Sequence, residues 1–173
     1  MVRIEVLRDE AQIRIGSFGE TLFIAHLRPV TTGSLRVLDQ AEAQFLEGRD
    51  RINLFTIMAA PIIMNVDPAL KEESVRMEAR FRDRVRAHAF LVPHGGLSAA
   101  VARTFMTAFN LLTRPPHPFK VFRECDPALE WLCAVPGQAA SFADAPTLAP
   151  LCREAERFWG ADPRPNDLEL RAG

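Results

Sequence analysis

The chain has 173 residues, of which 48% are hydrophobic and 25% are charged, and its formal net charge is −1. This composition is typical of an ordinary globular protein, and the length is enough for one domain with a core and an appendage. A net charge so close to zero excludes a general electrostatic attraction to nucleic acid or to an anionic membrane surface.

The sequence shows no targeting signal and predicts a cytoplasmic protein. The first residues are charged where a signal peptide needs an apolar core. The longest apolar run, 52–66, is interrupted by asparagine and proline and is too short to span a bilayer. Three cysteines, without the spacing of metal ligands, fit a reducing compartment.

The first part of the chain predicts strands followed by a helix and a buried strand. Residues 12–15 and 21–27 read as a hairpin, preceded by an earlier strand over 2–7. Apolar residues at helical spacing after Thr32, the expected N-cap, predict a helix over 33–47. The continuously apolar stretch that begins at Ile52 indicates a strand covered on both faces.

The middle of the chain alternates between helical and extended patterns. Asp67 followed by proline predicts the start of a helix over 68–87. A strand over 88–94, a helix over 97–112, a strand over 119–122 and a helix over 126–134 follow. Strands that alternate with helices indicate a parallel sheet with helices packed against it.

The character of the sequence changes after Gly137. We expect an α/β domain over 1–137, then a linker, a short amphipathic helix over 147–159 and a frayed polar tail within 138–173. The predicted domain is an α/β sandwich with a mixed sheet of roughly four to five strands, flanked by about four helices.

Four motifs carry a resemblance to a known family. They are Leu27-Arg-Pro-Val-Thr31, Phe109-Asn-Leu-Leu-Thr-Arg-Pro115, Val121-Phe122 and Ala128-Leu-Glu-Trp-Leu132. In their order and spacing they resemble the STAS domains, which include the anti-sigma-factor antagonists, and more narrowly the STAS/Sec14-like bacterial proteins. The resemblance runs from about Gln12 to Leu132. It implies a small α/β sandwich that works by binding other proteins and not by catalysis.

The sequence departs from regulatory STAS domains at their phosphorylation site. Those domains carry a serine or threonine, usually after an aspartate, just beyond the central strand. Here that strand leads into Met58-Ala-Ala-Pro-Ile-Ile-Met-Asn-Val66, and the first hydroxyl or carboxylate is Asp67. Ser74 lies too far into the following helix. We therefore do not transfer the phosphorylation switch to this chain.

A few polar residues are candidates for chemistry. His94, Gly95 and Gly96 follow a predicted strand end, where α/β sheets place ligands, so they are the best ligand candidates. We favour the simpler interpretation of a solvated histidine in a plain loop. Cys125 immediately precedes the expected N-cap Asp126, but no catalytic base is evident and an inert thiol is favoured.

Two apolar segments need a cover. The helix over 97–112 is apolar nearly all round, and the predicted loop 61–64 is equally apolar. Leaving such a loop in water costs roughly 1.5–3 kcal/mol for each large side chain. The cover is the chain's own C-terminal helix, a second copy or a different protein. The predicted interaction surface comprises Pro61, Ile62, Ile63, Met64, Phe105, Met106, Phe109, Phe158 and Trp159.

Three functions remain open at this point. The first is a non-enzymatic STAS-like regulatory or scaffold domain that acts by protein–protein contact, as a homodimer. The second is a binding module for a small apolar molecule or lipid, in a pocket near 61–64, 97–112 and Phe119. The third, ranked last, is an enzyme that uses His94 or Cys125. We expect no catalytic residue, metal, cofactor, nucleic-acid partner or membrane span.

Overall fold

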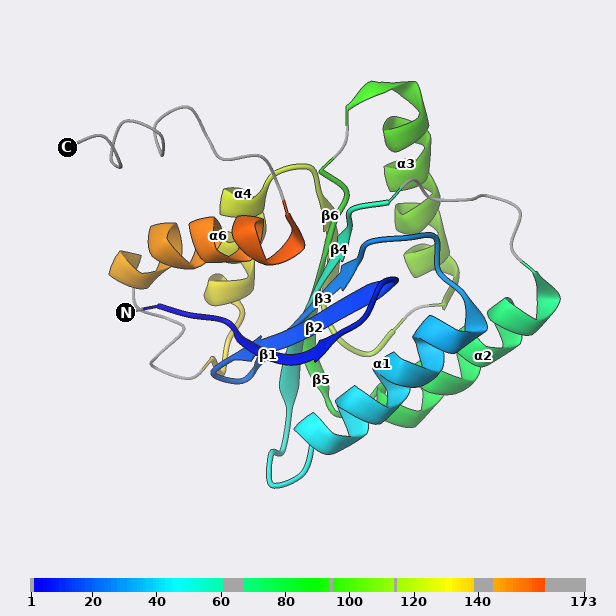
Figure 1. The fold of residues 1–173 in the computed structure, drawn as a ribbon, viewed down its shortest axis with the longest axis horizontal. Coiled ribbons are helices and arrows are strands. Elements are labelled where there is room, and N and C mark those ends of the chain that lie inside the picture. The colour runs from blue at the N-terminus through cyan, green and yellow to red at the C-terminus, as the bar shows by residue number, and fades with distance from the viewer. Residues whose placement is uncertain (1, 61–66, 94, 114, 139–144, 161–173) are drawn as a thin grey trace.

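The computed structural model describes residues 2–60, 67–93, 95–113, 115–138 and 145–160 (Figure 1). Inside helices, the side chains at 97, 98, 105, 108–113 and 145–147 also lie outside the description. Among the described residues, no helix combines the length and the apolar character that a membrane crossing requires.

A single mixed sheet of six strands runs through the molecule, with its strands in chain order (Figure 1). The strands are β1 (Glu5–Asp9), β2 (Ile13–Phe18), β3 (Thr21–His26), β4 (Ile52–Met58), β5 (Val85–Leu91) and β6 (Phe119–Phe122). β1, β2 and β3 pair antiparallel, whereas β3, β4, β5 and β6 pair parallel. The tight β2–β3 turn contains Gly19 at a φ of 59°, a backbone conformation that glycine adopts without steric cost.

Helices connect the parallel strands and cover both faces of the sheet (Figure 1). They are α1 (Thr32–Phe45), α2 (Pro68–Phe81), α3 (Gly96–Thr113), α4 (Cys125–Ala134) and α6 (Ala145–Trp159). Side chains alternate across a strand, so β4 divides its residues between two cores. Leu54 and Met58 point to the side of α1, α2 and α3, while Phe55 and Ile57 point to the side of α4 and α6.

Local sequence signals define the starts of α1 and α2. At α1, the Thr31 side chain accepts a hydrogen bond from Ser34 N at 3.1 Å, and the Ser34 side chain accepts one from Thr31 N at 2.9 Å. This capping box satisfies backbone donors that an isolated helix end leaves open. At α2, Asp67 Oδ1 accepts from Ala69 N at 3.0 Å, ahead of Pro68 in the first helical position.

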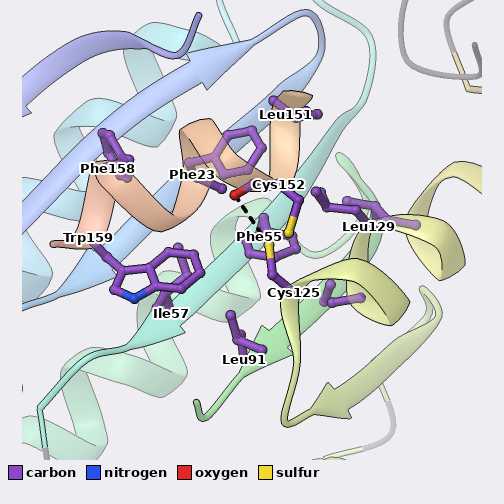
Figure 2. Close-up of a cluster of buried hydrophobic side chains, with 14 of the residues drawn as sticks. Phe23, Phe55, Ile57, Leu91, Cys125, Leu129, Leu151, Cys152, Phe158 and Trp159 are labelled. Carbon is purple, nitrogen blue, oxygen red and sulfur yellow. Dashed lines mark hydrogen bonds between the residues drawn. The ribbon is translucent and has the colours of Figure 1, made fainter. Parts of the chain in front are cut away.

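The C-terminal helix α6 belongs to the main hydrophobic core. Leu151, Cys152, Phe158 and Trp159 of α6 pack in one cluster with residues of α4 and of the sheet. Figure 2 shows the α6 side chains gathered around the sheet residue Phe55 in this cluster. The apolar side of α6 is thus buried by the chain itself, on the same sheet face as α4. The expectation that this helix covers the apolar helix over 97–112 is wrong, because α3 packs on the opposite face of the sheet.

The glycine at position 16 records how closely α6 approaches the sheet. A Cβ atom there would lie 2.6 Å from Ile4 Cγ2 and 2.8 Å from both Glu5 O and Phe158 Cε2. Real Cβ atoms do not come so close to backbone, so any larger side chain must displace β1 or α6. Gly16 therefore allows three segments to meet at one point.

The structure confirms the α/β fold class and corrects several details. The sheet has six strands, one more than the upper expectation, because the N-terminal segment pairs with the hairpin as β1. The helix expected over 68–87 ends at Phe81, since Val85 already opens β5 after an exposed turn. The N-cap of α1 is Thr31 and not Thr32. Cys125 is the first residue of α4, with Glu124 as its N-cap.

Candidate functional site

The outer face of α3 is exposed and uncharged over its described part. Ala100, Val101, Thr104 and Thr107 are exposed, and the Val101 side chain retains 46% of its accessible surface. Both threonine hydroxyls donate to the carbonyl one helical turn earlier, at 3.1 Å for Thr104 and 2.9 Å for Thr107. Their hydrogen-bonding capacity is thus partly used within the helix, and their methyl groups add to the apolar surface. We call these four residues the α3 strip.

The inner face of α3 packs on the end of the parallel sheet. Ala99 and the half-buried Met106 contact a cluster formed by Met58, Phe90 and Val92. Arg103 is the one charged residue within the helix sequence Gly96–Thr113, and its guanidinium donates to Val92 O at 3.3 Å. The sheet anchors α3 on this side. The α3 strip has no such cover among the described residues.

The predicted interaction surface is distributed over several environments. Pro61, Ile62, Ile63 and Met64 lie outside the described residues, as do the side chains of Phe105 and Phe109. Met106 is half-buried on the inner face of α3. Phe158 and Trp159 belong to α6 and are buried against the sheet, with 7% and 9% of their surface exposed. They are not available to a partner in this arrangement.

The ligand candidates at the start of α3 are described only in part. His94 lies outside the described residues, whereas Gly95 and Gly96 are exposed. Gly96 has a φ of +87°, so a side chain at this position would strain the backbone that leads into α3. At the neighbouring helix, Asp67 serves as the N-cap of α2, and the Ser74 hydroxyl donates to Leu70 O at 2.8 Å inside that helix.

His26 lies at the carboxyl end of β3 and was not singled out by the sequence. It is 5% exposed, and its Nδ1 atom has no hydrogen-bond partner among the described residues. Burial lowers the pKa of His26 from 6.5 to about 4, so the ring is neutral at physiological pH. Its backbone carbonyl accepts from Ala59 N and Ala60 N, both at 3.1 Å, and so fixes the chain as it leaves β4.

A second histidine, His88, lies on β5. His88 Nε2 and Thr56 Oγ1 are hydrogen-bonded at 2.9 Å across β4 and β5. The His88 ring meets the Phe119 ring edge-on, with centroids 5.0 Å apart. Burial, with a further contribution from the His117 charge, lowers the pKa of His88 from 6.5 to about 3. His88 is therefore a neutral, hydrogen-bonded part of the sheet face.

The described residues offer no metal centre and no activated thiol. No group of three or more histidine, cysteine or acidic side chains in the described ranges could hold a metal ion. Cys125 and Cys152 are buried side by side in the α4–α6 core, where Cys125 Sγ lies 3.9 Å from Cys152 O (Figure 2). A hydrogen bond to Cys152, followed by burial, raises the pKa of the Cys125 thiol, which opposes thiolate formation.

These features follow from contacts that sequence spacing does not encode. Thr56 and His88 come together because parallel pairing aligns β4 and β5, whereas His26 lies beside Met58 further along the sheet. The sequence signal for His26, Thr56 and His88 is weak: each is a polar residue inside an apolar strand. Such residues need a partner or a neutral form when buried, which makes them worth noting in any strand.

The fold defines a class of protein. A mixed sheet that begins with a hairpin and continues through βαβ units, with helices on both faces, is consistent with the SpoIIAA-like fold. The chain is similar to an uncharacterised protein of the DUF3478 family with a SpoIIAA-like fold from Shewanella loihica PV-4. The two share 15% sequence identity at a TM-score of 0.53, over 75% of this chain and 92% of that protein.

At this level of identity the likeness shows the fold, and it confirms the expected resemblance in fold to STAS domains. No protein-family model and no curated protein sequence matches the chain.

Proposed function

We propose that the chain is a non-enzymatic STAS-like regulatory or scaffold domain that acts by protein–protein contact, with the α3 strip as its contact surface and a second copy of the chain as its partner. The observation that carries this proposal is the exposed, uncharged outer face of a helix whose inner face is already packed. An exposed surface without charge on a folded domain favours association.

A second copy fits this strip for reasons of charge and shape. In a two-fold contact each residue meets the same patch of the other copy, so a charged strip would repel itself. Ala100, Val101, Thr104 and Thr107 carry no charge and have small side chains. Two such helices approach closely without repulsion or steric conflict. The departure at the phosphorylation site also favours a constitutive contact over a phosphorylation switch.

Replacing Val101 with glutamate tests the proposal. We expect the wild-type chain to sediment as a dimer, and Val101→Glu to weaken the dimer by at least tenfold in its dissociation constant. The substitution would place two carboxylates opposite each other across the two-fold axis, and like charges there cost on the order of 1–2 kcal/mol. Sedimentation equilibrium over a range of protein concentrations measures the change.

Val75→Glu is the matched control because Val75 is 50% exposed on α2, away from the α3 strip. It introduces the same charge and should leave the dimer unchanged. A wild-type chain that stays monomeric up to high micromolar concentration would contradict the proposal. So would an equal loss of association in both variants.

A further inference from the structure

An open hollow of about 290 Å³ lies at the amino ends of β5 and β6, at the opposite end of these strands from the start of α3. It is formed by the turn before β4, the turn between α2 and β5, and the segment that leads into β6. Its lining residues are Arg51, Arg82, Asp83, Val85, Arg86, Pro116, His117 and Pro118. Segments distant in sequence thus bring basic side chains around one space.

The arginines of the hollow differ in how they are held. Arg86 is fixed, because its guanidinium pairs with Glu20 at 2.8 Å and its side chain is only 15% exposed. Arg51 and Arg82 are exposed, and neither makes an ion pair within the described part of the chain. Asp83 is the only carboxylate in the lining. Three arginines against Asp83 leave the lining with an excess of positive charge, which Glu20, paired with Arg86, and Glu78, close to Arg82, reduce in part.

A neighbouring arginine shows what a purely structural role looks like in this turn. Arg84 Nε donates to Asp50 O at 2.6 Å, and the same guanidinium donates to the carbonyls of Leu46 and Arg49. It ties the end of α1 to the start of β5 and uses its donors on backbone. Arg82, two residues earlier, donates no side-chain hydrogen bond to the described residues. The Glu78 carboxylate is near enough for the Arg82 charge to lower its pKa, but the Arg82 N–H donors remain available for an anion.

His117 reports on the charge of the hollow. Its Nδ1 donates to Arg82 O at 3.4 Å, so the neutral ring carries its proton on that nitrogen. Burial, together with the Arg82 charge, lowers the pKa of His117 below its ordinary value of 6.5, although the hydrogen bond to Arg82 O opposes this. A bound anion would offset the arginine charge and favour protonation of the ring.

We propose that this hollow binds a small oxyanion of the phosphate class, held by the guanidinium groups of Arg51 and Arg82 beside the fixed Arg86. Planar guanidinium groups match tetrahedral oxyanions through paired N–H donors, which distinguishes such a site from one that attracts any anion. The site lies away from the α3 strip, so it stands independently of the proposed dimer.

Proton NMR titration of the histidine rings tests the proposal on the intact chain. We expect the pKa of His117 to rise toward 6.5 in inorganic phosphate relative to chloride at the same ionic strength, and the rise to saturate with phosphate concentration. Loss of one resonance in His117→Asn assigns the signal. A parallel titration with glycerol phosphate separates free phosphate from a phosphorylated metabolite by which of the two saturates at lower concentration.

The double variant Arg51→Gln, Arg82→Gln should abolish the phosphate-dependent rise. Arg36→Gln is the matched control, since Arg36 is exposed on α1 and lies outside the hollow. An identical His117 titration in phosphate and chloride overturns the proposal, as does a rise that survives in the double variant. In the latter case the arginines only complement the negative end of α2, and phosphate is an adventitious ion. If the double variant does not fold, the wild-type comparison still decides.

Discussion

At the scale of single residues, the most unusual group is the carboxyl of Glu42 on α1. Glu42 is 3% exposed and faces Asp39 on its own helix and Arg80 on α2. Arg80 already pairs with Asp39 at 2.6 Å. Burial, followed by the Asp39 charge, raises the pKa of Glu42 from 4.5 to about 8, with Arg80 opposing the shift. Glu42 is therefore mainly protonated at neutral pH, which avoids an uncompensated buried charge.

The raised pKa predicts a loss of stability as the pH rises from 4.5 to about 8. A folded-state pKa above the unfolded one gives a contribution that is complete below pH 4.5 and declines as the pH rises through 8. Glu42→Gln mimics the protonated form. We therefore expect its free energy of unfolding, relative to wild type, to increase by on the order of 1–3 kcal/mol from pH 5 to pH 9. Urea unfolding at both pH values measures the difference.

Glu72→Gln provides the comparison for this measurement, because Glu72 is exposed on α2. It should change stability equally at both pH values. If Glu42→Gln shows no more pH dependence than Glu72→Gln, then the Glu42 carboxyl ionises freely in the folded protein and its burial does not control its titration.

At the scale of elements, the order of strands and helices could be predicted because each element carries a local pattern. The continuously apolar β4 and the helical spacing of α1 need no knowledge of the rest of the chain. The boundary between α2 and β5 could not be predicted, because the charged Arg82, Asp83 and Arg84 continue a plausible helical face. The helix ends there because β5 must begin at Val85 to pair with Ile52.

The candidate site was less predictable than the elements. The apolar character of α3 is local and was recognised, but which of its faces stays exposed depends on its packing against Phe90 and Met58. The arginine hollow was missed entirely, because Arg51, Arg82 and His117 come from separate connections. Sequence spacing cannot show that these connections meet at one end of the sheet.

The role of α6 supports a prediction about a truncated chain. We propose that residues 1–137 form the STAS-like unit and that the remainder is an appended segment whose helix completes one face of it. Cutting after Gly137 removes Leu151, Phe158 and Trp159 from the core. It also removes Gln138, whose side chain exchanges hydrogen bonds with the buried Asn53 at 2.7 and 3.1 Å.

The truncated chain should therefore bind more hydrophobic dye and melt at lower temperature, and it should aggregate or associate more strongly than the full chain. Each large side chain that loses its cover costs roughly 1.5–3 kcal/mol, so the cost of removing α6 is comparable to the whole stability of an ordinary domain unless new contacts form. Dye fluorescence, thermal melting and light scattering measure these effects. Unchanged dye binding, melting temperature and mass would mean that α6 does not cover this face in solution.

At the scale of the whole molecule, the buried histidines and the buried glutamate change the free energy of unfolding with pH in opposite directions. The folded-state pKa of His26, about 4, lies below its ordinary 6.5, so the unfolded chain takes up the proton first. The His88 pKa, about 3, acts in the same direction. The histidines therefore lower stability as the pH drops from 6.5 toward 4, whereas Glu42 lowers it as the pH rises from 4.5 to about 8, and the two effects oppose each other where the ranges overlap.

This balance predicts the acid response of a His26 variant. The pKa difference of His26 corresponds to a loss of roughly 3 kcal/mol once the pH falls to the folded-state value. His26→Phe keeps an aromatic ring at this buried position and removes the titrating group, so its stability should decline less steeply between pH 7 and pH 4.5. His117→Asn removes a histidine whose pKa is also lowered but whose ring is only half-buried, so its slope should fall between those of wild type and His26→Phe. Urea unfolding across this range measures the slopes, and an equal slope for His26→Phe and wild type would show that His26 does not govern acid sensitivity.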